Sequence, residues 1–388
     1  MNKIAKPWIY NRFSKVFQPA TFLMMRLNFA KRALVLVIIA TLTFSFISYN
    51  FYLRLQQVVE ASEKGLAGLE MLTPLFKTVQ MVQEHRGLTA GVLGGTTTLE
   101  GERLSKQKQV EASFDQFTNF LPIYILELDN WKKITAKWRF IKDKGMSLGR
   151  EDNFSQQTVI VNQLLLLSQK IADDYALTNH PDLAIYYILN TTIQQLSAAQ
   201  EFLGQTRAFG TGILAKKQST ELQKVQISTL IAQTNKSVHS LQYNLEKTAK
   251  YNPAIKSTLI KSSDDVLKTS HRIFELLKSD ILHEKYLTAP EAFFQIMTDA
   301  IDKSYLTMYQ VLLPTTTELI NQRQLEVKQL LAIMATILVF AFFIVIYFSI
   351  GIYIATIKSI DSISNTTLGF SRGDLTSRIS INPQSEFK

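Results

Sequence analysis

Two arginines stand in similar local contexts, and they are the residues of this sequence best suited to hold a ligand. Residues 86–93 read Arg-Gly-Leu-Thr-Ala-Gly-Val-Leu, and residues 207–214 read Arg-Ala-Phe-Gly-Thr-Gly-Ile-Leu. A guanidinium offers a planar fork of donors that matches a planar oxyanion. Two such groups, Arg86 and Arg207, brought together from facing helices would hold a small anion with a single negative charge.

Polar neighbours one helical turn away could complete such a site. Gln83 and Thr89 flank Arg86, and Thr211 follows Arg207. Residues three or four positions apart share one face of a helix, so these side chains lie near the arginines. We therefore expect Gln83, Thr89 and Thr211 to supply hydrogen bonds to the anion.

The alternative is that each arginine serves only the structure. Most helical arginines are exposed or paired with a carboxylate, and Glu84 or Glu201 could be such a partner. The duplication of the motif favours ligand binding.

No residue pattern indicates catalysis. The sequence has no cysteine, no phosphate loop, no histidine pair at zinc-binding spacing and no Gly-x-Ser-x-Gly motif. We expect no catalytic residues, no metal and no cofactor within this sequence. An enzymatic output domain beyond Lys388 remains compatible with it.

Two uncharged apolar stretches predict transmembrane helices. The stretch 33–53 and the stretch 329–357 contain no charged residue, and a helix needs roughly 20 apolar residues to cross a bilayer. Residues 1–32 are basic and lack acidic residues, which could indicate a nucleic-acid-binding arm. Because a membrane span follows, the positive-inside rule places this segment in the cytoplasm instead.

The segment between the spans is predicted to be all-α. Apolar residues recur there at spacings of three and four, as in amphipathic helices. We expect Pro74 to interrupt an early helix, Gly94-Gly95 to end the next one, and Thr315-Thr-Thr-Glu318 to form a capping box. Short loops favour antiparallel bundles. A last helix from about Thr316 would run unbroken into the second span.

The stretch Gln-Glu-His-Arg-Gly-Leu-Thr-Ala-Gly-Val-Leu (83–93) resembles the signature of the NIT domain, the nitrate- and nitrite-sensing domain of bacterial receptors. The second arginine motif and residues 290–302 are similar to later segments of that family, and the resemblance covers roughly residues 60–310. It implies paired four-helix bundles that recognise nitrate or nitrite through Arg86 and Arg207. His85 stands where the family usually has a glutamate, so we expect it to add a pH-dependent charge beside the site.

The stretch Arg372-Gly-Asp-Leu-Thr-Ser-Arg-Ile379 resembles the connector of a HAMP domain, and Glu386-Phe387 resembles the start of its second helix. HAMP domains are parallel dimeric coiled coils, so this resemblance implies a homodimer. The expected organisation is a basic cytoplasmic N-terminus (1–32), a transmembrane helix (33–53), a periplasmic helical sensor (54–328), a second transmembrane helix (329–355) and a partial HAMP domain (356–388).

Together these features predict a two-pass receptor of the bacterial inner membrane. Its expected partners are a small anion, membrane lipid, a second copy of the chain and cytoplasmic signalling proteins, and no nucleic acid. The favoured output is chemotaxis through a methyl-accepting receptor. The alternative is the sensor half of a histidine kinase or a diguanylate cyclase whose catalytic domain lies beyond residue 388.

Overall fold

The computed structural model describes residues 8–27 and 29–372, and every element of secondary structure in them is a helix. The prediction of an all-α fold is confirmed. The described residues belong to two units. One is the compact segment Val58–Glu326, and the other combines the described residues before Val58 with those after Glu326.

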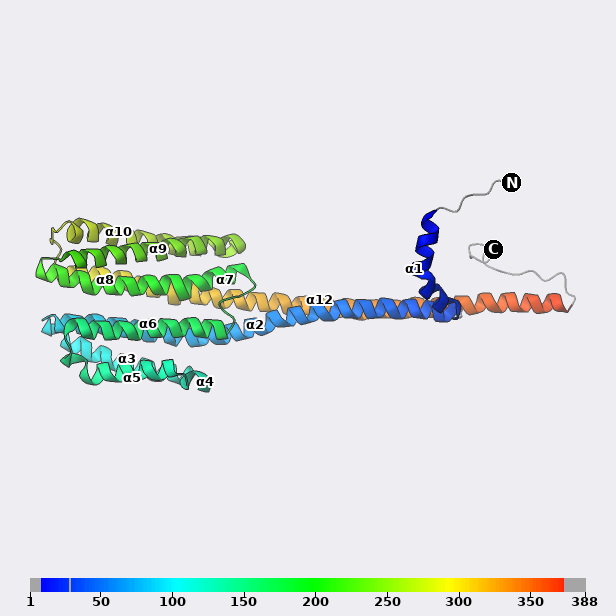
Figure 1. Ribbon diagram of the computed structural model, residues 1–388, viewed down its shortest axis with the longest axis horizontal. Helices are drawn as coiled ribbons and strands as arrows, with labels where there is room; N and C mark the ends of the chain where they lie inside the picture. The colour runs from blue at the N-terminus through cyan, green and yellow to red at the C-terminus, as the bar shows by residue number, and fades with distance from the viewer. Residues whose placement is uncertain (1–7, 28, 373–388) are drawn as a thin grey trace. The chain divides into compact units, whose positions relative to one another are not determined.

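The first bundle of the compact unit contains the part of α2 (Phe29–Leu93) within that unit, α3 (Glu100–Phe120), α5 (Asp129–Lys144) and α6 (Arg150–Asp174), with the short α4 (Ile123–Leu126) between α3 and α5 (Figure 1). Aromatic side chains fill its core. The Phe114 ring stacks on Trp138, and the Phe117 ring meets Trp131 edge-on. Burial of such large apolar surfaces is the main force that holds amphipathic helices together.

The second bundle follows in the chain. It contains α7 (Leu183–Asn190), α8 (Ser197–Lys216), α9 (Glu221–Tyr251), α10 (Lys256–Leu276) and α11 (Pro290–Thr307). Helix α8 packs against both α9 and α11, and α9 packs against α10. The arrangement agrees with the predicted pair of helical bundles, which lie side by side in Figure 1.

Local sequence explains where several helices begin and end. Helix α2 ends at Leu93, and Gly95 follows with a φ of 106°, a conformation that favours glycine. The Asp182 side chain caps α7 by accepting from the amides of Ala184 and Ile185. Thr220 forms a capping box at the start of α9.

Two predicted helix boundaries are wrong. Pro74 lies inside α2 without interrupting it, and residues 315–318 lie inside α12 (Leu313–Ser371) rather than at a helix start. Leu72, Leu75 and Phe76 beside the proline are almost fully buried, so their packing outweighs the lost backbone hydrogen bond.

Three π-helical turns adjoin helices in the described part of the chain. These turns are η3 (Thr191–Leu196) between α7 and α8, η5 (Leu277–Leu282) after α10, and η6 (Met308–Leu312) between α11 and α12. Helices α11 and α12 therefore form one continuous run through η6. The predicted unbroken helix from the sensor into the second apolar stretch is present, and it begins earlier than expected.

The second unit holds the apolar stretches. Two helices, over Val37–Leu93 and Pro290–Leu368, contain windows long and apolar enough to cross a membrane. Large apolar side chains stay exposed along both stretches, as lipid-facing residues would; they include Ile38, Leu42, Phe46, Phe340, Phe343 and Phe348. Helix α1 (Trp8–Met25) precedes the first of them. The HAMP-like residues 373–379 and 386–387 lie outside the described residues.

Candidate functional site

Arg86 of α2 is buried where the first bundle meets the second, with an exposed fraction of 1%. Its Nη1 donates to Thr158 Oγ1 at 2.8 Å, and its guanidinium carbon lies 4.8 Å from the centre of the Phe154 ring. Both partners belong to α6, one helical turn apart. An aromatic face and a hydroxyl thus hold the guanidinium plane in place.

Arg207 of α8 occupies an equivalent cradle in the second bundle. Its Nη1 donates to Thr298 Oγ1 at 2.8 Å, and its guanidinium carbon lies 4.8 Å from the centre of the Phe294 ring. Phe294 and Thr298 are again four residues apart, here on α11. The repeated arginine is therefore matched by a repeated Phe-x-x-x-Thr motif on a partner helix. That motif was missed from the sequence, although its fixed spacing is visible there.

The two cradles differ in their charged neighbours. Glu201 of α8 accepts from both terminal nitrogens of Arg86, at 2.6 and 3.0 Å. Among the described residues no carboxylate lies within ion-pair distance of Arg207, and its buried Nε has no hydrogen-bond partner. Burial, with the nearby charge of Arg86, lowers the pKa of Arg207 to about 10, which leaves it protonated at neutral pH.

Gln83 connects the two arginines. Its Nε2 donates to Glu201 Oε2 at 2.8 Å, and its backbone carbonyl accepts a long bond of 3.4 Å from Arg207 Nη2. Its Oε1 accepts from the buried hydroxyl of Tyr305 at 2.8 Å. The expectation that Gln83 lies beside the arginines holds, and Tyr305 is a member of the cluster that sequence reasoning missed.

Glycines allow α2 and α8 to approach closely at this point. A methyl group added to Gly87 would lie 2.7 Å from Arg207 Nη2, and one added to Gly204 would lie 3.1 Å from Arg86 Nη2. Each glycine faces the arginine of the other helix. The small residues of the motif therefore make room for a guanidinium.

Thr89 and Thr211, the other predicted site residues, make no hydrogen bond to either guanidinium among the described interactions. Thr89 Oγ1 lies 3.4 Å from His85 Nε2, and no contact joins it to Arg86 among the described interactions. The hydroxyl of Thr211 is buried and has no hydrogen-bond partner in the part of the chain described. Thr211 thus has free hydrogen-bonding capacity, whereas Thr89 serves the first bundle.

His85 does not supply the expected pH-dependent charge. Its side chain is buried against Trp138, and its Nδ1 lies 2.9 Å from Gln157 Oε1. Burial lowers its pKa to about 4, so the imidazole is neutral near pH 7. The expectation failed because one position along a helix turns a side chain by about 100° and so directs His85 into the first bundle.

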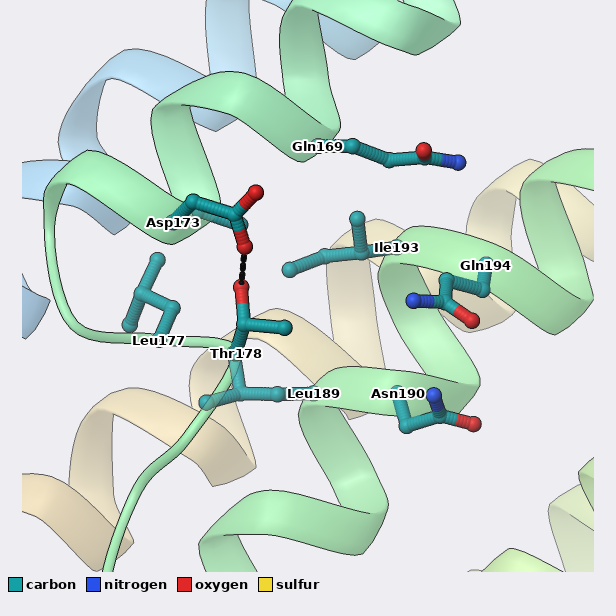
Figure 2. Close-up of a pocket in the computed structure, with 9 residues that line it drawn as sticks. Gln169, Asp173, Leu177, Thr178, Leu189, Asn190, Ile193 and Gln194 are labelled. Carbon is teal, nitrogen blue, oxygen red and sulfur yellow. Dashed lines mark hydrogen bonds between the residues drawn. The ribbon is translucent and has the colours of Figure 1, made fainter.

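A cavity of about 200 Å³ lies elsewhere in the compact unit, between the end of α6 and η3 (Figure 2). Gln169, Asn190 and Gln194 contribute polar groups to it, and on its other side Asp173 accepts a hydrogen bond from Thr178. The arginines do not line this cavity. They lie instead in a tightly packed cluster, in which an anion would have to replace or rearrange existing contacts.

A comparison of the chain with known families decides its relationship. The family described as nitrate and nitrite sensing, NIT, matches residues 77–307. The chain belongs to the NIT family. The match begins before Arg86 and ends after Tyr305, so it contains the whole arginine cluster. The NIT assignment indicates a sensor of nitrate or nitrite, and NIT is a sensory rather than a catalytic domain.

Other comparisons add little to the NIT assignment. No curated protein matches the chain. A solved structure of the NasR transcription antiterminator is similar over 74% of this chain and 83% of its own, at 14% identity and a TM-score of 0.41.

Proposed function

We propose that this protein is a two-pass membrane receptor whose NIT domain binds nitrate or nitrite at Arg86 and Arg207. The observation that carries the proposal is the pair of buried guanidinium groups within the matched residues, of which only Arg86 has a carboxylate partner among the described residues. A buried cation without a counter-charge is costly, and an anion that binds beside it removes that cost. Gln83, which already contacts Arg207, and Thr211, whose buried hydroxyl has no partner among the described residues, are the groups that can add hydrogen bonds. Thr89, which lies against His85, would have to turn toward the site to contribute.

The proposed signal path runs along α11, η6 and α12. Thr298 and Tyr305 of α11 touch the arginine cluster, and the same helical run continues to Ser371. A ligand shifts a conformational equilibrium only by its different affinity for the two states. We propose that anion binding favours one packing of the two bundles and that α12 passes this change to the HAMP-like segment.

The remaining parts of the proposal concern the cellular context. The receptor lies in the bacterial inner membrane as a homodimer, with its NIT domain in the periplasm. Its output is chemotaxis through cytoplasmic signalling proteins. A kinase or cyclase output is the alternative, and it predicts a nitrate-dependent change in phosphorylation or cyclic dinucleotide instead of swimming behaviour.

The direct test is calorimetry of the full chain in lipid nanodiscs. We expect Arg86→Ala and Arg207→Ala each to lower nitrate or nitrite affinity by about tenfold to a hundredfold. Arg207→Ala removes a hydrogen bond to a charged group, which costs roughly 1.5–3 kcal/mol. Arg86→Ala leaves the buried Glu201 carboxylate without its cationic partner, so its negative charge opposes the anion. Arg207→Lys should recover only part of the loss, since lysine lacks the planar fork.

Arg139, exposed on α5, provides the matched control, and Arg139→Ala should bind as the wild type does. Equal binding by the wild type and by the Arg86→Ala, Arg207→Ala double variant would refute the arginine site. A wild type that binds neither anion would refute nitrate and nitrite as ligands.

A further inference from the structure

Three charged side chains are almost fully buried in the arginine cluster. The exposed fractions are 1% for Arg86, 3% for Arg207 and 2% for Glu201. Charges at such positions are screened weakly by solvent, and they govern which further charge the site can accept.

Glu201 is saturated with donors. Its Oε1 accepts from Arg86 at 2.6 Å and from Gln205 at 2.7 Å, while its Oε2 accepts from Arg86 at 3.0 Å and from Gln83 at 2.8 Å. This geometry is the bidentate arginine–carboxylate pair, in which each charge neutralises the other. The outer edge of the Arg86 fork is therefore already occupied.

Arg207 carries the charge that remains. Its direct partners are neutral: the Thr298 hydroxyl, the Phe294 ring and the backbone carbonyl of Gln83. The charges of Arg86, Glu84, Asp302 and Glu201 also act on Arg207, the carboxylates from beyond ion-pair distance.

One of these outer groups is Glu84, a less buried residue that forms its own ion pair with Lys106 at 2.5 Å. Another is Asp302, half-buried on α11 and beyond ion-pair distance from Arg207 in the described structure. The fully buried set thus contains two positive charges and one negative charge.

We propose that Glu201 is the residue that selects for anion charge, because it cancels one of the two buried guanidinium charges and leaves room for one negative charge only. A nitrate or nitrite ion beside Arg207 completes the balance. A sulfate ion would bring a second negative charge next to the Glu201 carboxylate, and the fully buried charges described in this cluster include no third cation to compensate it. This inference rests on the proposed anion site and assigns its specificity to one side chain.

The first test compares nitrate and sulfate binding by the full chain and by Glu201→Gln, in nanodiscs at constant ionic strength. Glutamine keeps the shape and an acceptor oxygen but removes the charge. Nitrate affinity should rise about tenfold and sulfate affinity about a hundredfold, because the gain scales with ligand charge. Glu111→Gln is the matched control, since Glu111 pairs with Lys142 on the exposed surface of the first bundle. An unchanged sulfate-to-nitrate ratio in Glu201→Gln would overturn the inference.

In Glu201→Gln both Arg86 and Arg207 are buried without a carboxylate, and a second test avoids that situation. Arg86→Gln alone leaves Glu201 free to neutralise Arg207, so nitrate binding should fall at least tenfold. Adding Glu201→Gln restores one net positive charge, and the double variant should regain most of the nitrate affinity while still rejecting sulfate. A folded double variant that binds nitrate no better than Arg86→Gln would overturn the inference.

The two proposals fail in different ways. A wild type that binds nitrate, loses it in Arg207→Ala and keeps its anion selectivity in Glu201→Gln overturns only the role of Glu201. A wild type that binds neither nitrate nor nitrite overturns the anion site and this inference with it.

Discussion

At the scale of residues, Arg86 and Arg207 make equivalent contacts with a phenylalanine and a threonine, but they differ in their charged partners. Each guanidinium rests on a phenylalanine ring and donates to a threonine one turn from that phenylalanine. Among the described residues, Arg86 also binds a carboxylate and Arg207 does not. A fully paired arginine contributes to packing and fixes its neighbours, whereas an arginine without a carboxylate attracts an anion. We therefore assign the direct electrostatic contact with the ligand chiefly to Arg207.

Stability at acid pH should depend on His85. Its pKa falls from 6.5 to about 4 on folding because the imidazole is buried. Below pH 6.5 His85 is protonated in the unfolded chain but stays neutral in the native chain. Its contribution to the free energy of unfolding is therefore fully present above pH 6.5 and is lost as the pH falls toward 4. The loss should be on the order of 3 kcal/mol.

Denaturant unfolding of the wild type and of His85→Gln at several pH values measures this loss. The difference in unfolding free energy between the two proteins should stay constant above about pH 6.5 and change below it. The pKa of His180 is lowered in the same direction, and the comparison of variants cancels its effect. Exposed His283 serves as the control, since His283→Gln should follow the wild-type profile. Parallel profiles for His85→Gln and the wild type would contradict the prediction.

At the scale of elements, the close approach of α2 and α8 decides whether the site can form. Gly87→Ala places a methyl group 2.7 Å from Arg207 Nη2, a separation that carbon atoms do not tolerate. The Arg207 guanidinium has to shift, and its hydrogen bonds to Gln83 and Thr298 change with it. We expect nitrate affinity to fall by about tenfold without any change in charge, the equivalent of about 1.4 kcal/mol.

Gly101→Ala is the matched substitution. Gly101 lies on α3, and no atom lies within 4 Å of the added methyl group. This change should leave nitrate binding intact and raise stability by roughly 0.5–1 kcal/mol, because alanine is the better helix former. Equal nitrate affinity in the two alanine variants, measured by calorimetry, would show that the helix contact does not control the site.

At the scale of the whole molecule, the two apolar helices predict a membrane topology that labelling can test. The chain has no cysteine, so a single introduced cysteine gives a unique label. A membrane-impermeant maleimide added to intact spheroplasts should label Lys217→Cys and should not label Arg372→Cys until the membrane is opened. The positive-inside rule is the physical reason. The opposite pattern would reverse the proposed orientation.

Assembly is the second property at this scale. Ile357 and Ile360 are exposed apolar residues of α12 that follow the predicted second transmembrane helix (329–355), and they fit the seam of a parallel coiled coil. Cysteines at these positions should crosslink two copies of the full chain readily in membranes, and a cysteine at Ser359 should do so poorly. Equal crosslinking at all three positions would argue against the dimer seam.

The sequence by itself determined the helical fold, the two apolar stretches and the repeated arginines. Hydropathy, helical periodicity and motif spacing are local properties, so they can be read before the chain is folded. The same local signals predicted a helix break at Pro74 and a helix start at residues 315–318, and both predictions are wrong. At these positions the packing of buried neighbours outweighs the preference of a single residue.

Only the tertiary structure decided how the charges combine. Glu201 and Arg207 lie six residues apart on α8, yet the Glu201 carboxylate forms its ion pair with Arg86 on α2. His85, adjacent to Arg86 in sequence, faces a different core. A side chain's ionic partner depends on which helices pack together and at what rotation, and no spacing along one helix encodes either quantity.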